Sequence, residues 1–266
     1  MVTHHLLYDA LIYTYTLSLL FYFSDFARSN QSSKRMGLGL LYVVWILQTI
    51  FLVIYWNHYV RDWFFSESTV LFVFSWLLVS SSIVIDRFFR MEFFAFLVNV
   101  ISFVVCIVHI FVNREVISVE EPWIVHDELW FVQILSLVVS YVALSLSAIF
   151  AGMYIFFHHK LKNKQWTPSV KRMPSLETME KFMFSSVFIG IALFTVAFSF
   201  SRISIALHVD GQLLLNANVF QACMVLITYS VYVVGYYSLR ITSHQLAIWN
   251  LAAYGIAMLY VLIQIG

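Results

Sequence analysis

Histidine is the residue of this chain best suited to chemistry. The sequence has nine histidines, and four of them stand at or next to the ends of long apolar stretches. A neutral imidazole is a good axial ligand for haem iron, and two imidazoles from different helices could hold one haem. Alternatively, these side chains are ordinary polar residues at the level of the lipid headgroups. The four candidates are His58, His109, His126 and His208.

Two carboxylates lie close to two of these histidines in the sequence. Asp127 is adjacent to His126, and Asp210 lies two residues after His208. A histidine bound to a metal usually donates its second ring N–H to such a partner, which fixes the tautomer of the ring. We therefore expect His126 and His208 to be the best pair for haem iron.

Apolar helices must position these histidines. The chain is 62% hydrophobic and 11% charged, and a hydrocarbon core of about 30 Å requires about 20 mainly apolar residues in a helix. The composition predicts an all-α polytopic membrane bundle with eight transmembrane helices. We expect one integral membrane domain over 1–266, with N-terminal spans over 6–113 and a second part over 126–265. The apolar stretches are Leu6–Ser24, Leu38–Asn57, Val70–Ile85, Phe93–Asn113, Leu129–Phe157, Phe182–Ser201, Leu214–Leu239 and Leu246–Ile265.

The basic residues orient the predicted bundle. Twelve of the fifteen lysines and arginines fall in the first, third, fifth and seventh connections, and the other connections hold one each. Connections rich in Lys and Arg stay on the cytoplasmic side of a membrane. Both termini are therefore expected outside the cytoplasm, in a multi-pass protein of a bacterial plasma membrane. In this orientation the four candidate histidines lie near the outer surface.

A second polar group lies on the predicted cytoplasmic side. His158, His159 and His244 are the three histidines there, and the first two begin a basic segment. This segment is either a binding site for a cytoplasmic partner or anionic lipid, or an ordinary basic loop. Its candidate contact residues are Lys160, Lys162, Lys164, Lys171 and Arg172.

Other kinds of chemistry have little support in the sequence. It contains no Gly-rich phosphate loop, no H-E-x-x-H and no G-x-S-x-G pattern, so we expect a protein that is not an enzyme. We also expect contact with membrane lipid and none with nucleic acid. Cys106 and Cys223 fall within predicted spans, either as two buried thiols or as a disulfide if the fourth and seventh spans touch.

Three segments resemble the haem-handling cytochrome c assembly family represented by CcsA and ResC. The first is HDELWFVQILSLVVSYVALSLSAIFAGMYIFFHHKLKNK (His126–Lys164), in which an outer histidine opens a long helix rich in Ser, Tyr and Ala that a basic turn follows. The others are Met173–Ile203 and Tyr229–Leu262. The Trp-rich haem-presenting loop of the family has no counterpart in Ser204–Val219, which lacks Trp. This departure argues against cytochrome c synthetase activity.

The size, the eight spans and the missing loop resemble one branch of that family, the HemX-like membrane proteins of Gram-positive bacteria. The resemblance implies a negative regulator that lowers the amount of glutamyl-tRNA reductase, the first committed enzyme of tetrapyrrole synthesis. In this hypothesis haem binds within the bundle, and the Ser29–Arg35 and Lys160–Lys181 loops engage the reductase. The alternative hypothesis is a haem carrier or assembly factor for the maturation of c-type cytochromes.

Overall fold

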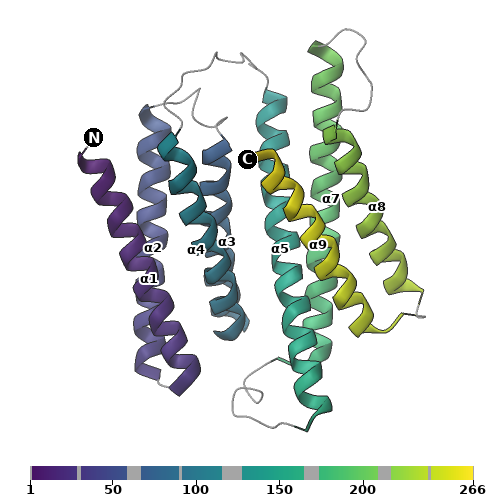
Figure 1. The fold of residues 1–266 in the computed structure, drawn as a ribbon, viewed down its shortest axis with the longest axis horizontal. Coiled ribbons are helices and arrows are strands. Elements are labelled where there is room, and N and C mark those ends of the chain that lie inside the picture. The colour runs from purple at the N-terminus through teal and green to yellow at the C-terminus, as the bar shows by residue number, and fades with distance from the viewer. Residues whose placement is uncertain are drawn as a thin grey trace. The chain divides into compact units, whose positions relative to one another are not determined.

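The computed structural model describes the backbone of residues 2–28, 31–58, 67–89, 92–115, 128–164, 174–208, 217–238 and 241–265. In these ranges all regular structure is α-helical and forms eight helices (Figure 1). The helices are α1 (Val2–Arg28), α2 (Gln31–His58), α3 (Glu67–Phe89), α4 (Glu92–Glu115), α5 (Glu128–Lys162), α7 (Leu176–His208), α8 (Ala217–Tyr237) and α9 (Ser243–Ile265).

Each predicted apolar stretch coincides with one helix, so the all-α expectation is confirmed. Five helices are long and apolar enough, over their described residues, to cross a membrane, and α8 adds a shorter apolar stretch. The full count of eight spans and the outward termini stay predictions. The five candidate spans are Arg35–Ile54, Thr69–Phe88, Phe93–Ile110, Phe131–Lys162 and Leu176–Arg202, and the shorter stretch is Ala222–Tyr237.

Two predicted cytoplasmic loops are in part helical. Helix α2 begins at Gln31, so Lys34 and Arg35 belong to its first turns. Helix α5 continues to Lys162, and α7 begins at Leu176, so both ends of the predicted Lys160–Lys181 loop are helix. The physical reason is that a helix ends where its backbone hydrogen bonds end, whereas hydropathy marks only the end of the apolar run. Basic side chains also favour the last turn of a helix because of its dipole.

The described helices fall into two compact units, 1–123 and 124–266. Whether both belong to one domain stays a prediction. In the first unit α1 packs against α2 and α4, and α3 packs against the same two helices. Its apolar core includes Leu11, Phe51, Phe72 and Cys106 near one end.

Hydrogen bonds between buried polar side chains link all four helices of the first unit. The Gln48 amide donates to Ser75 Oγ at 3.2 Å, and Ser75 and Ser102 share a hydrogen bond of 2.9 Å. The Tyr15 hydroxyl donates to Asn99 Oδ1 at 3.4 Å. Hydrogen bonds of this kind hold apolar helices together where no water is available.

In the second unit α5 is the central helix. It pairs most extensively with α7 and also contacts α9, while α8 packs on α7 and α9 (Figure 1). The Ser140 hydroxyl donates to the Gly190 carbonyl at 2.8 Å, and the Ser147 hydroxyl donates to the Met183 carbonyl at 2.9 Å. Ser147 lies seven residues after Ser140 on α5, and Met183 lies seven residues before Gly190 on α7. The two bonds therefore fix the antiparallel register of these helices.

Candidate functional site

The four histidines predicted to lie near the outer surface are described to different extents. His58 is the last residue of α2 and His208 the last of α7. The side chains of both lie outside the described residues, as do His126, Asp127 and Asp210 entirely. Their proposed roles as haem ligands and partners stay predictions.

His109 is fully described, and it lies in the aromatic core of the first unit. Its side chain is 2% exposed. The ring centroid of Phe72 is 5.0 Å from that of His109, and the ring centroid of Tyr8 is 6.3 Å away. Two aromatic rings thus occupy space beside the imidazole, so a haem at His109 requires them to move. Its ligand role also stays a prediction.

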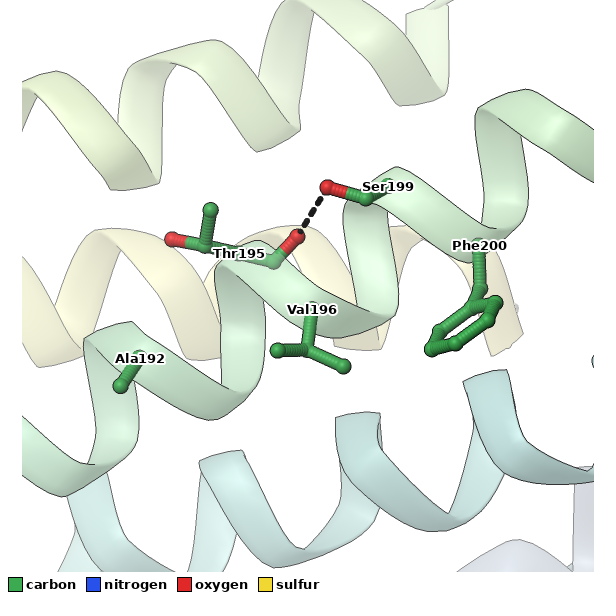
Figure 2. Close-up of a pocket in the computed structure, with 5 residues that line it drawn as sticks. All are labelled: Ala192, Thr195, Val196, Ser199 and Phe200. Carbon is green, nitrogen blue, oxygen red and sulfur yellow. Dashed lines mark hydrogen bonds between the residues drawn. The ribbon is translucent and has the colours of Figure 1, made fainter.

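A cleft of about 430 Å³ lies along α7 in the second unit. Figure 2 shows its five lining residues on this one helix, spaced so that they share a face: Ala192, Thr195, Val196, Ser199 and Phe200. The Thr195 and Ser199 hydroxyls donate to carbonyls one turn back along α7, each at 2.8 Å. Because both hydroxyl hydrogens are donated within the helix, this wall of the cleft is mainly apolar. The lining residues include no histidine.

The interior of the second unit contains several buried polar groups. The Asn250 amide donates to Ser147 Oγ at 2.6 Å, and Ser145 and Tyr254 share a hydrogen bond of 2.6 Å. The Asn250 carbonyl oxygen and the hydroxyls of Tyr229 and Tyr232 are buried without a hydrogen-bond partner among the described residues. An unpaired polar group in an apolar interior costs about 1–3 kcal/mol.

The predicted cytoplasmic end of the second unit contains a pair of histidines. His158 near the end of α5 and His244 at the start of α9 have ring centroids 4.8 Å apart, with an interplanar angle of 45°. The Tyr154 ring stacks on His158 at 6.1 Å and 9°. His159, in contrast, is exposed and hydrogen bonds to Asn163 at 3.0 Å. No group of three His, Cys, Asp or Glu side chains that could hold a metal ion occurs among the described residues.

The same end of α5 presents basic side chains. Lys162 and Lys164 are exposed, and Lys160 lies 5.7 Å from the centre of the Phe156 ring. Lys164 lies two residues after the end of α5 and has a left-handed backbone conformation, with φ 54°. Lys171 and Arg172, the other predicted contact residues, lie outside the described residues.

The two cysteines are free thiols. Cys106 is buried in the first unit and Cys223 is exposed on α8. Two free thiols were one of the two alternatives from the sequence, but only Cys106 is buried.

Long apolar helices that bury serine, asparagine and tyrosine side chains define a multi-pass α-helical membrane protein. The chain is 34% identical over 251 residues to Protein HemX of Brevibacillus brevis, covering 93% of this chain and 91% of the relative. It is 29% identical over 251 residues to Protein HemX of Bacillus subtilis (strain 168), covering 94% of this chain and 91% of that relative. The chain therefore belongs to the HemX family. No family model and no solved structure matches it, and the link to the CcsA and ResC family stays a prediction.

The histidine pair is the feature that sequence reasoning did not find. His158 and His244 were assigned to the cytoplasmic side, but 86 positions separate them and no motif joins them. The pairing depends on the contact between α5 and α9. Their shared side of the membrane was the one signal in the sequence that could have suggested it.

Proposed function

We propose that this protein is a regulator in the bacterial plasma membrane that lowers the amount of glutamyl-tRNA reductase and so limits tetrapyrrole synthesis. The observation that carries the proposal is the similarity to Protein HemX over 93% of the chain. In the proposed topology eight helices cross the membrane and both termini lie outside. The protein acts as an adaptor and carries out no reaction of its own.

Haem is the proposed signal, with His126 and His208 as its axial ligands. The register of α5 and α7 supports this pair. The hydrogen bonds of Ser140 and Ser147 make Glu128, the first residue of α5, level with Arg202 in α7. Helix α7 continues for six residues beyond that level, or about 9 Å, to His208. His126 precedes the first residue of α5 by two positions in the sequence, and His208 ends α7 at the same end of the unit.

Haem iron can take two axial imidazoles, one from each of two helices. The chain would bind it through these rings, with Asp127 and Asp210 to fix their tautomers. For haem to act as a signal it must bind one conformer of the bundle more tightly than another, since equal affinities shift nothing. His58 and His109 are the reserve candidates, and the packed rings beside His109 make it the weaker of the two.

The surface proposed for the reductase is the basic end of α5 with the segment that follows it as far as the start of α7 at Leu176, so Glu177 and Lys181 lie outside this surface. Lys160 and Lys162 lie in the last turn of that helix, and Lys164 follows two residues after its end. Lys181 on α7 forms an ion pair of 2.8 Å with Glu177. This pair supplies a matched control at the same end of the unit.

The test measures reductase by quantitative immunoblot in a deletion strain that carries plasmid copies of the gene. Deletion should raise the reductase, and the wild-type copy should restore its level. The Lys160→Glu/Lys162→Glu/Lys164→Glu variant should fail to restore it, although its amount in the membrane is unchanged. The Glu177→Lys/Lys181→Glu exchange, which keeps the pair and the net charge, should act as wild type.

Two outcomes would overturn parts of the proposal. An unchanged reductase level in the deletion strain, together with a loss of c-type cytochromes on a haem-stained gel, would replace the regulator with the haem carrier. Restoration by the triple glutamate variant would remove the basic end of α5 as the docking surface. The absorption spectrum of the purified protein, compared with that of His126→Ala, tests the haem ligand separately.

A further inference from the structure

We infer that His158 and His244 form a binding site for a divalent transition-metal ion at the predicted cytoplasmic end of the second unit. The site joins the end of α5 to the start of α9. It is distinct from the proposed outer haem site and does not depend on the proposed function.

The spacing of the two rings carries the inference. An imidazole nitrogen binds a transition metal at about 2.0–2.1 Å, which puts the metal about 3.2 Å from the ring centroid. Two rings on one ion are then about 4.5 Å apart at a right angle and about 5.2 Å apart at a tetrahedral angle. The observed separation of 4.8 Å lies between these values.

The same spacing excludes a haem between these two rings. Axial histidines stand on opposite faces of the porphyrin, so their centroids are about 6.4 Å apart. The 4.8 Å between the rings of His158 and His244 is too short for this arrangement. The ligand that fits is a single ion bound by two adjacent imidazoles.

The surroundings of the pair hold the rings and leave them accessible. Tyr154 stacks on His158 at an interplanar angle of 9°, and its hydroxyl lies within hydrogen-bonding reach of Ser243. Ser243 directly precedes His244, so one tyrosine contacts His158 and the residue next to His244. Both histidines are only partly buried. An ion can therefore reach them from the end of the unit.

The ligand set indicates the class of ion. Imidazole suits copper, zinc, nickel and iron, and affinity among divalent ions is highest for Cu²⁺. No third His, Cys, Asp or Glu joins the pair in the part of the chain that the structure describes. Water or a group from a binding partner would fill the remaining positions, so the ion would keep open coordination sites.

The test is titration of the purified full-length protein with Cu²⁺, followed by electron paramagnetic resonance. The protein carries a tag without histidine, and His4→Ala/His5→Ala is present in every sample because adjacent histidines at the N-terminus would compete for copper. The compared proteins are this parent, His158→Ala, His244→Ala and His159→Ala. His159 is the matched control, since it neighbours the pair in sequence but bonds to Asn163.

The parent should bind one Cu²⁺ with the superhyperfine pattern of two nitrogen ligands. His158→Ala and His244→Ala should each show one nitrogen and lose at least about tenfold in affinity, since partners that merely orient a ligand already contribute 10- to 100-fold. His159→Ala should match the parent. An unchanged spectrum in either pair variant, or an equal loss in His159→Ala, would overturn the site. If an alanine variant fails to fold, the corresponding glutamine variant is measured instead.

Discussion

Replacing Gly190 by alanine tests the close packing of α5 on α7. Gly190 is buried, and Ser140 donates to its carbonyl. A Cβ atom at Gly190 would lie 2.7 Å from Leu144 Cδ2 and 2.9 Å from Leu144 Cγ. Leu144 is fully buried. The new methyl group must therefore displace the leucine or push the helices apart.

The expected effect follows from two opposing contributions. Overpacking of a filled core destabilises by about 1–3 kcal/mol. Alanine stabilises a helix by about 1 kcal/mol relative to glycine. The net loss at Gly190 is therefore about 0–2 kcal/mol. Gly255 on α9 is exposed, and no heavy atom lies within 4 Å of a Cβ atom there. Gly255→Ala should therefore stabilise the protein by about 1 kcal/mol, without a loss from overpacking.

The assay is unfolding of the detergent-solubilised protein, followed by tryptophan fluorescence. Gly190→Ala should be less stable than Gly255→Ala by about 1–3 kcal/mol. In a Leu144→Ala background, where the obstructing side chain is gone, Gly190→Ala should become neutral or stabilising. If Gly190→Ala matched Gly255→Ala, or if its loss persisted without the leucine, the packing argument would be wrong.

Three further predictions follow from single contacts. Lys164→Gly should stabilise by about 1 kcal/mol, because glycine adopts the left-handed conformation without strain; an unchanged or lower unfolding temperature would contradict this. Ser147→Ala should destabilise the protein by about 1 kcal/mol because it removes the acceptor of the Asn250 amide. In a denaturant titration, Asn250→Leu added to Ser147→Ala should recover part of this loss. In a Cys223→Ser background Cys106, 1% exposed, should react with a maleimide only after unfolding, and labelling of the native protein would refute its burial.

Much of the helical architecture could be predicted from the sequence, because apolar runs of about 20 residues have few alternatives to helix in a membrane. The ends of the helices could not. Leu129–Phe157 was predicted from hydropathy, whereas α5 runs from Glu128 to Lys162. His158, His159 and Lys160 end the apolar run without ending the helix. Because the helix continues past Phe157, His158 is part of α5, and its ring meets that of His244 at the start of α9.

The polar contacts inside the second unit were beyond prediction for a different reason. The sequence shows that α5 is rich in serine, but it does not show which serine meets which helix. Ser147 contacts both Met183 and Asn250, which are distant in sequence. Hydrophobic periodicity gives little help here, because helices in lipid are apolar on every side and their polar contacts are set by packing.

The two histidine pairs show how far membrane topology constrains a site. Topology assigns each residue a side of the membrane and a depth in it. Two residues at the same depth meet only if their helices are neighbours and the faces that carry them point toward each other. For His158 and His244 the contact of α5 with α9 supplies this missing information. For the proposed pair of His126 and His208, α5 contacts α7, but His126 and the side chain of His208 lie outside the described residues. The inner pair is therefore open to a test of ligand geometry, and the outer pair first requires a test of ligand identity.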